Sequence, residues 1–585
     1  MVVNKHIGKI IAILMAVAVL ACFAAMVWSD ELSEAMGGKA VSMEYEEELF
    51  NTDEIISIDI LMDEDEWEEM LSNAISEEYY VCDVVVNGVT FENVAIRPKG
   101  NTSLSSIAMD PETDRYSLKL EFDHFSSGQT CFGLDKLILN NNYADATNMK
   151  EAIVYDMYQY LGADASLYNY ASVSVNGEYW GVYLALEGVE QSFMLRNYGT
   201  QDGELYKPES MEMGGGDDDK GSFGGFPGGD FDFGDMPDME GFDPENFDFG
   251  DMTPPSGFGG GFDPDNMPDM GDFDPSEPGG FSFGSGGANL NYSDDELDSY
   301  QTIWDGAITD SGDKDHKRVI KALKNISEGT DLEEYLDIDN VLKYMAVHTF
   351  VVNMDSLSGT MAHNYYLYEY NGQLNIIPWD YNLSFGGMGN GGDDATSTIN
   401  DAIDTPFSST EFFDALLENE EYLEKYHEYL NMLVEEYVYG GRFDEVYTRI
   451  RNQIDSLVEA DPTAFYEYDE YIEAADLLKD VIYLRAESVK GQLDGSIPST
   501  DSAQNEDSSN LIDASGIDLS VMGTMNMGGG DEGGFGPGGD RHGESGRDEN
   551  RPEREMPGGD FQVEDFPEGG FPGGELPEGE FPELP

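Results

Sequence analysis

Two low-complexity tracts limit how much of this chain can fold. Residues 211–290 and 496–585 are dominated by Gly, Asp, Phe, Pro and Met, and they show neither helical nor strand periodicity. Gly and Pro at this density prevent a packed core, so both tracts are predicted to be disordered. Their acidic units lack the ligand spacing of an EF-hand or a calcium-binding repeat. Packed structure is therefore expected in residues 51–210 and 291–495.

The charge of the chain narrows the class of partner. It carries 119 acidic and 29 basic residues, which gives a formal net charge of -90. Nucleic acid is excluded as a partner, because phosphate backbones are bound by clustered Lys and Arg. An acidic surface of this strength favours divalent cations and basic protein segments. The sequence does not indicate an oligomeric state.

The N-terminus carries a targeting signal. A basic flank precedes an unbroken apolar run over residues 10–28, and acidic residues follow it. A run of this length can nearly span a bilayer as a helix, and the positive flank stays inside, which places the rest of the chain on the extracytoplasmic side. We favour a retained anchor within residues 1–30. A cleaved signal peptide and lipidation at Cys22 stay open as alternatives. Residues 31–50 are predicted to be a polar linker, with order starting at Ile55.

Residues 51–210 have the pattern of a mostly antiparallel sheet. Alternating β-branched runs meet at Asn87-Gly88 and at Asn176-Gly177, and Asn-Gly between such runs is the strongest short signal for a hairpin. Apolar residues spaced three and four apart predict one main helix that stops at Gly162. Cys82 and Cys131 are the only exported cysteines; they either pair or stay as buried free thiols.

Residues 291–495 are mainly helical by apolar spacing, with one embedded hairpin at Asn371-Gly372. Pairing by reflection about this turn puts Asn364 opposite Trp379 and His363 opposite Asp380. The fold class is therefore α+β, with a β-rich part, a disordered insertion and a helical part. This order suggests two lobes with a cleft between them.

The open end of that hairpin gathers oxygen ligands. Asn364 and Asp380 should lie close together, and the loop after Asp355 is long enough to return to the same point. Phosphoryl transfer depends on positioning and on metal ions that neutralise phosphate charge, and Mg²⁺ prefers carboxylate and amide oxygens. Protein kinases present an Asp, an Asn, a hairpin and a metal-binding Asp in the same order.

Several motifs in order resemble the CotH kinase family. They are RPKGNTS, YSLKLEFD, GLDKLILNNNYADATNMKEAIVYDM, SVNGEYWGVYLALEGVEQSFMLRNYG, GELYKP and the segment DSLSGTMAHNYYLYEYNGQLNIIPWDYNLSFGG. The resemblance covers residues 52–210 and 295–490. It implies an atypical protein-kinase-like fold with a β-rich N-lobe and a helical C-lobe. It also implies an enzyme that uses ATP and Mg²⁺ or Mn²⁺ to phosphorylate Ser or Thr of surface or spore-coat-like proteins.

The resemblance implies roles for residues in the C-terminal half. Asp355 matches the catalytic Asp that orients the substrate hydroxyl or accepts its proton. Asp380 matches the metal-binding Asp, and Asn364 is the expected second metal ligand. Because Tyr381 and Asn382 follow Asp380, no Phe-Gly switch is expected.

In the N-terminal half, Lys119 is the expected contact to ATP phosphates, with a solvated strand lysine as the alternative. Arg97 and Lys99 end a strand and enter a Gly-Asn-Thr-Ser turn, which favours a phosphate-facing loop. Glu151 is expected either to pair with Lys119 or to lie on the surface. Two other functions compete with a protein kinase: a catalytically silent coat or surface protein, and a phosphotransferase acting on a non-protein substrate.

Overall fold

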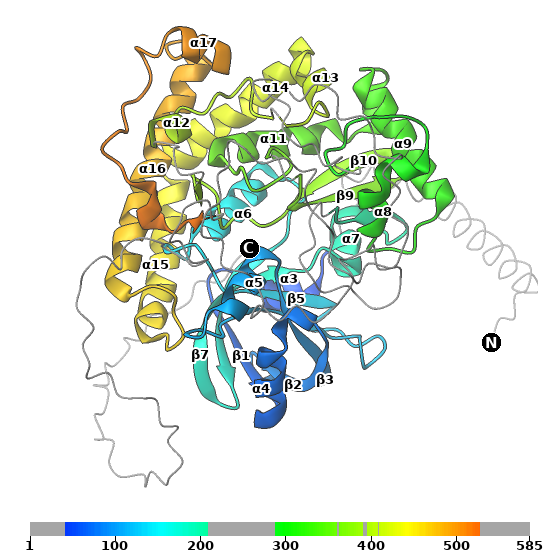
Figure 1. Ribbon diagram of the computed structural model, residues 1–585, viewed down its shortest axis with the longest axis vertical. Coiled ribbons are helices and arrows are strands. Elements are labelled where there is room, and N and C mark those ends of the chain that lie inside the picture. Colours follow the sequence, from blue (N-terminus) through cyan, green and yellow to red (C-terminus); the bar gives the residue numbers. More distant parts are fainter. Residues whose placement is uncertain (1–40, 209–286, 360–361, 390–394, 408, 527–585) are drawn as a thin grey trace, which may run out of the picture. The chain divides into compact units, whose positions relative to one another are not determined.

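A computed structural model describes residues 41–208, 287–359, 362–389, 395–407 and 409–526 (Figure 1). The fold is mixed α+β, with a sheet-rich N-terminal part and a helical C-terminal part. The predicted anchor in residues 1–30 and most of both low-complexity tracts lie outside the described residues. In the part of the chain that is described, no helix combines the length and apolarity needed to cross a bilayer.

Seven strands close into a barrel in the order β1-β2-β3-β4-β5-β7-β6. Their bounds are β1 (Ile56–Leu61), β2 (Tyr80–Val86), β3 (Val89–Lys99), β4 (Ser117–Glu121), β5 (Lys136–Asn140), β6 (Tyr168–Val175) and β7 (Glu178–Glu187). All neighbours are antiparallel except β1 and β6, which close the barrel in parallel. The alternating patterns predicted the strands, but they could not show that the first strand returns to pair with the sixth.

The two Asn-Gly hairpins in the barrel are confirmed. Val86 pairs with Val89, and Val175 pairs with Glu178, so each turn has two residues. Both central residues of each turn have positive φ. Asn and Gly tolerate this region at low cost, and the resulting turn matches the twist of the flanking strands.

Ordered structure begins before Ile55, although the sequence pattern predicted that it starts at this residue. A short helix, α3 (Glu44–Glu48), lies inside the stretch predicted to be a linker. Tyr45 in this helix is fully buried, and its hydroxyl donates to Glu187 Oε1 at 2.6 Å. The buried Tyr45 ring, with its hydroxyl hydrogen-bonded, holds α3 against the barrel. Further helices of this part are α4 (Glu64–Ser72), η1 (Ala74–Ser76), α5 (Thr102–Met109) and α7 (Gln191–Tyr198).

The main helix of the N-terminal part is α6 (Lys150–Leu161), and it ends at Gly162 as predicted, with φ of 68°. Most of its side chains are buried, which an amphipathic pattern does not foresee. The helix packs between the outer face of the barrel and the helical part, and its apolar residues belong to the larger of the two cores. Glu151 is therefore held in the interior and does not lie on the surface.

The helical part contains the predicted hairpin and a longer set of helices. β9 (Tyr365–Tyr370) and β10 (Gln373–Pro378) pair from Tyr370↔Gln373 to Tyr365↔Pro378, which confirms the predicted register. β8 (Glu204–Tyr206) joins the edge of β9. The helices are η5 (Leu297–Tyr300), α8 (Gln301–Asp305), α9 (Asp313–Ser327), α10 (Leu332–Tyr335), α11 (Ile338–Val351), α12 (Ala395–Ile399), α13 (Asp414–Leu417), α14 (Glu420–Asn431), η6 (Met432–Val438), α15 (Arg442–Ala460) and α16 (Tyr468–Asp494).

The fold also continues beyond residue 495, where the disordered tail was predicted to begin. α17 (Asp501–Glu506), η7 (Leu519–Met522) and β12 (Met525–Asn526) follow, and β12 pairs in parallel with β11 (Met388–Gly389). Met522 is fully buried. Local composition did not reveal this, because the stretch is rich in Ser and Asp and carries only isolated apolar anchors.

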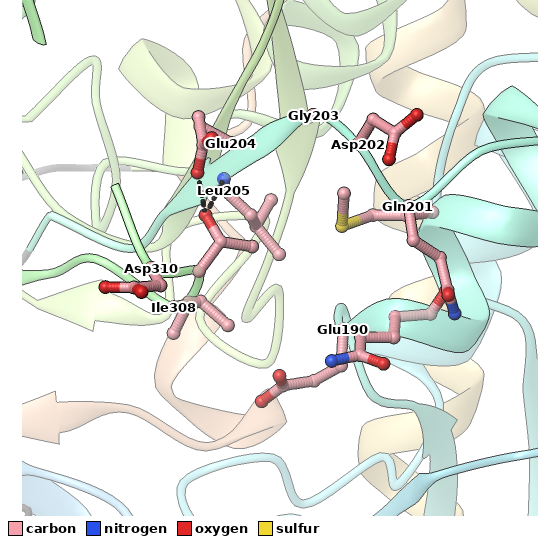
Figure 2. Close-up of a pocket in the computed structure, with 11 residues that line it drawn as sticks. Glu190, Gln201, Asp202, Gly203, Glu204, Leu205, Ile308 and Asp310 are labelled. Atoms are coloured by element: carbon pink, nitrogen blue, oxygen red, sulfur yellow. Dashed lines mark hydrogen bonds between the residues drawn. The ribbon is translucent and has the colours of Figure 1, made fainter. Parts of the chain in front are cut away.

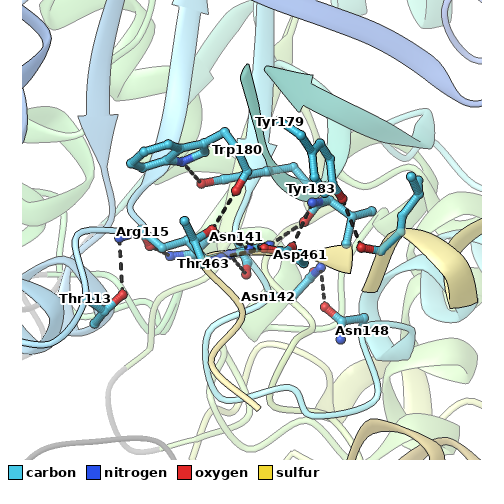
Figure 3. Close-up of polar contacts among 12 residues, drawn as sticks. Thr113, Arg115, Asn141, Asn142, Asn148, Tyr179, Trp180, Tyr183, Asp461 and Thr463 are labelled. Atoms are coloured by element: carbon cyan, nitrogen blue, oxygen red, sulfur yellow. Dashed lines mark hydrogen bonds and ion pairs between the residues drawn. The ribbon is translucent and has the colours of Figure 1, made fainter. Parts of the chain in front are cut away.

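A buried polar network joins the barrel to the end of α15 (Figure 3). Arg115 Nη1 lies 2.6 Å from Asp461 Oδ2, and both side chains are almost fully buried. The same Asp461 oxygen accepts from the backbone N–H of Val182 at 2.9 Å, while Thr463 Oγ1 accepts from Arg115 at 2.9 Å. The Arg115 guanidinium also lies 4.7 Å from the centre of the Tyr183 ring. This network fixes the barrel strands against the helical part.

Cys82 and Cys131 are free and buried, which decides between the two alternatives that the sequence left open. Cys82 Sγ donates to the carbonyl of Val94 at 3.6 Å. Both thiols lie in the barrel core, among apolar side chains.

Candidate functional site

The hairpin of β9 and β10 brings Asp355 and Asn364 into direct contact. Asn364 Nδ2 donates to the Asp355 carbonyl at 2.8 Å and to its carboxylate Oδ2 at 3.1 Å. His363 Nε2 lies 2.8 Å from Asp355 Oδ1, and the Asp355 side chain is only 13% exposed. His363 and Asn364, which precede β9 at the open end of the hairpin, thus orient both carboxylate oxygens of Asp355.

Asn353 links Asp355 to Asp380. Its Nδ2 donates to the Asp380 carbonyl at 3.3 Å, and its Oδ1 accepts from the Asp355 backbone N–H at 3.3 Å. Asn353 is almost fully buried. Sequence reasoning missed this residue; the available signal was its place two residues before Asp355, just after α11.

Three residues next to these side chains have a backbone conformation with positive φ. Asn364 and Asp380 have φ of 58° and 61°, and Val352 has φ of 49°. Positive φ is uncommon outside glycine, and for a β-branched residue it is a genuine outlier. Such conformations persist only where the surrounding structure imposes them, and they cluster at functional sites.

Asp380 and Glu151 lie close enough for their charges to interact across the junction of the two parts. Burial raises the pKa of Glu151, and the Asp380 carboxylate raises it further. Burial also raises the pKa of Asp380, as does Asp355, while Lys99, Lys207 and His363 oppose the shift. Neighbouring carboxylates in a dry site repel one another, and this pattern is typical of a site that binds a cation or carries out acid–base chemistry.

A short polar chain runs from β3 to α6. Lys99 Nζ donates to Asn140 Oδ1 at 3.2 Å, and Asn140 Nδ2 donates to Glu151 Oε2 at 2.8 Å. Lys99 also lies 5.6 Å from the centre of the Trp379 ring, next to Asp380. The structure therefore places Lys99, with Asn140 as an intermediary, where Lys119 was expected to meet Glu151. Asn140 was missed; its signal was a polar residue ending an otherwise apolar strand.

Lys119 and Arg97 lie on the same outer face of the barrel but farther along it. They are direct partners across β3 and β4. Arg97 forms an ion pair with Glu77, and Lys119 Nζ lies 3.9 Å from Glu121 Oε2. Burial and the nearby Lys136 lower the pKa of Lys119 to about 8. The expected pairing of Lys119 with Glu151 is thus not formed, because Lys119 lies beside Glu121 and Lys136 instead.

The Gly-Asn-Thr-Ser turn after Lys99 is the start of a helix. Gly100 has φ of 137°, and a Cβ there would lie 2.9 Å from Ser103 Oγ, so only glycine fits. α5 begins at Thr102. The expectation of a loop after Lys99 is corrected: the strand passes through a strained glycine directly into a helical turn.

Known families provide an independent comparison. Residues 96–246 and 273–489 match the family described as CotH kinase protein, which is more than half of the chain. The chain belongs to the CotH kinase family. No curated protein matches this CotH-family chain significantly. The family match includes every site residue discussed above, from Arg97 to Asp380.

The residues of this CotH-family site fit a divalent cation only in part. Among the described residues, no group of three or more His, Cys, Asp and Glu is arranged to hold a metal ion. Glu151 Oε1 is nevertheless buried without a hydrogen-bond partner in the described part of the chain. Mg²⁺ keeps several water or phosphate ligands and needs only one or two carboxylates from the protein. Asp380 would supply one such carboxylate, while the printed contacts of the Asn364 side chain are to Asp355.

A cavity of about 380 Å³ lies beside this junction, at the connection that follows β7 (Figure 2). Glu190, Met194, Leu205 and Ile308 contribute to its lining. Glu190 also binds Lys136, at 2.8 Å, on the barrel face that carries Lys119. β8 leads from the cavity lining to Lys207, whose charge acts on Asp380. The cavity and the carboxylate site therefore lie at opposite ends of one short strand.

Proposed function

We propose that this CotH-family protein is an ATP-dependent protein Ser/Thr kinase with a two-lobed, kinase-like fold. The barrel with α6 forms the N-lobe, and the helical part with the β9–β10 hairpin forms the C-lobe. Lys99 and Glu151 come from the first, and Asp355 and Asp380 come from the second. The observation that carries the proposal is the meeting of these four side chains at the junction.

Asp355 is the residue that receives the proton of the substrate hydroxyl. A carboxylate offers about four lone-pair positions on its two oxygens. His363 and Asn364 occupy one position on each oxygen, so they fix the orientation of Asp355 and leave room for a hydroxyl donor. Precise orientation of this kind contributes strongly to catalysis, since small misplacements of a reacting group cost large factors in rate.

Asp380 and Asn364 are the residues that would hold a divalent metal, and Lys99 would bind phosphate. ATP supplies the phosphoryl group, and Mg²⁺ or Mn²⁺ neutralises its charge. Glu151 orients Lys99 through Asn140, and its other oxygen is buried without a hydrogen-bond partner among the described residues. Lys119 and Arg97 add positive charge along the same barrel face. The cavity after β7 has the volume of a small ligand pocket, but Glu190, Asp202, Glu204 and Asp310 line it, and this acidic lining disfavours the phosphates of a nucleotide there.

The substrate is proposed to be a protein segment that carries Ser or Thr among basic residues. The charge of -90 attracts such segments and repels acidic ones. We further propose that residues 1–30 hold the protein at a membrane, with the kinase on the extracytoplasmic side.

The decisive experiment measures transfer of labelled phosphate. The chain from residue 31 onward is incubated with labelled ATP, Mn²⁺ or Mg²⁺ and a basic Ser-containing peptide. Asp355→Ala and Asp380→Ala are expected to abolish transfer. Asp480→Ala, at an exposed position of α16, is the matched control and should leave transfer unchanged.

Other results of nucleotide-binding and transfer measurements would support one of the two competing functions. A protein that shows no thermal shift with nucleotide and metal is a silent surface or coat protein, since a ligand that binds the folded state must raise its stability. Nucleotide binding without transfer to any protein would instead indicate a phosphotransferase for a different substrate class.

A further inference from the structure

The last described residues of the chain lie outside the family match and contact segments that adjoin Glu151 and Asp380 in the sequence. The match ends at residue 489, whereas η7 and β12 span residues 519–526. These residues, which we call the strap, touch two segments that are far apart in sequence. One is the start of α6, which carries Glu151. The other is the segment that follows Asp380.

On the α6 side, the strap meets the chain through its backbone. The carbonyl of Met522 accepts from the backbone N–H of Ala146 at 3.1 Å, and the carbonyl of Gly523 accepts from Lys150 Nζ at 3.3 Å. Lys150 is fully buried and directly precedes Glu151. A buried ammonium needs acceptors, so the Gly523 carbonyl helps to hold the first turn of α6 in place.

The fit at Gly523 leaves no room for a side chain. Its φ is 84°, and a Cβ there would lie 2.5 Å from the carbonyl oxygen of Ala144 and 2.8 Å from the backbone nitrogen of Ala146. All of the nearest atoms belong to backbone, which cannot move aside as a flexible side chain does. Contact between the strap and the α6 side therefore depends on a glycine.

On the side of Asp380, the strap pairs with the segment that follows this residue. The backbone N–H of Met525 donates to the Gly387 carbonyl at 3.0 Å, and β12 pairs with β11. A Cβ on Gly386 would lie 2.9 Å from Leu519 Cδ1, so the two segments are in close contact. A direct link between the two sides runs nearby, from Asn382 Nδ2 to the Tyr143 carbonyl at 2.9 Å.

We propose that the strap is a positioning element that ties the first turn of α6 to the segment after Asp380. Glu151 and Asp380 come from these two segments, so their separation depends on how the segments are held. The strap belongs to neither and contacts both. The expected effect of the strap on catalysis rests on the proposed kinase function. The expected coupling of the two segments does not depend on that function.

The test uses the full chain with Gly523→Ala, and Gly516→Ala is the matched control. Gly516 lies in the same C-terminal stretch, is exposed, and has no atom within 4 Å of the position that a Cβ would take. Hydrogen exchange is followed at amides bonded outside the strap, in residues 147–150 and 384–387. Gly523→Ala is expected to speed exchange in both segments, while Gly516→Ala leaves both unchanged.

A second variant separates the two sides. Met525→Pro removes the N–H that donates to Gly387. It is expected to loosen residues 384–387 and leave residues 147–150 protected. Protection of both segments in Gly523→Ala overturns the proposal. Global loss of protection in Gly523→Ala, together with an unaltered 384–387 segment in Met525→Pro, overturns it as well.

Activity gives an independent readout. Gly523→Ala is expected to lower kcat by about 10- to 100-fold, as small misplacements of catalytic groups do, with little change in the KM for the peptide. An equal fall in kcat and rise in KM would indicate a disturbed peptide-binding site and would contradict a positioning role, and kcat is calculated per folded molecule. If the unaltered protein transfers no phosphate, the kinase proposal fails, and hydrogen exchange alone decides the strap.

Discussion

Replacing Asp461 by Ala tests whether the buried network between the barrel and α15 holds the two parts together. Asp461 accepts from Arg115, from the Val182 backbone and from Thr463. The substitution leaves the Arg115 guanidinium buried without its counter-ion. Removing one partner of a buried ion pair costs about 3–5 kcal/mol. A domain of ordinary stability, about 5–15 kcal/mol, then unfolds at clearly lower denaturant but still folds.

The assay is urea unfolding of the chain from residue 31 onward, followed by tryptophan fluorescence. Trp180 reports directly, since its carbonyl accepts from Thr463 Oγ1 at 2.8 Å. The expected loss in the free energy of unfolding is about 3–5 kcal/mol for Asp461→Ala. Arg115→Met combined with Asp461→Leu should recover much of it, because replacing both charges by apolar groups removes the unpaired cation.

Two results would refute this reasoning. A loss below about 1 kcal/mol for Asp461→Ala would put the pair in the range of exposed ion pairs, so the burial of Arg115 would not matter. A double variant less stable than Asp461→Ala would show that Arg115 stabilises the fold through its contact with the Tyr183 ring and not through its ion pair with Asp461.

Three further predictions concern buried groups. Burial lowers the pKa of His348 to about 3, so the stability contributed by the neutral imidazole is complete above pH 6.5 and is lost as pH falls. In urea unfolding, the protein should lose stability between pH 7 and pH 5, and His348→Gln should reduce that loss by about 2 kcal/mol. A variant with an unchanged pH profile would contradict this. Burial raises the pKa of the Cys82 and Cys131 thiols, so neither should react with a thiol reagent at pH 8 until urea is added; rapid reaction of the native chain from residue 31 onward would show that the barrel opens. The Tyr381 hydroxyl contacts Tyr158 Oη at 2.6 Å, so Tyr381→Phe should cost about 1–3 kcal/mol by leaving a buried hydroxyl unpaired, and a neutral effect in thermal unfolding would mean that water replaces it.

Local patterns predicted the elements that carry the site. Asn-Gly turns fixed three hairpin registers, since a two-residue turn with positive φ leaves only one pairing. The register of β9 and β10 follows from the Asn371-Gly372 turn alone, and it places Asn364 at the open end of the hairpin, where its side chain contacts Asp355. Apolar spacing found α6 and its stop at Gly162.

Local patterns did not predict which residues, far apart in the sequence, contact one another. Lys119 and Lys99 are both strand lysines with alternating neighbours, and nothing local distinguishes which of them reaches the carboxylates. The answer depends on which of the two lysines lies beside Asn140 of β5, the residue that contacts Glu151 on α6. Asn140 and Asn353 were missed because each acts by bridging two segments, and a bridge has no spacing in the sequence.

By itself, the sequence determined the hairpins, the main helix and the resemblance to one kinase family, and it led to the two acidic residues proposed for the centre of the site. These follow from contacts between near neighbours, for which residue type and period are sufficient. Only the tertiary structure decided that the barrel closes, that Glu151 is buried, that Lys99 reaches Asn140, and that residues 519–526 return to the site. Each of these depends on which surfaces meet, and burial is a property of the whole fold and not of any local stretch of chain.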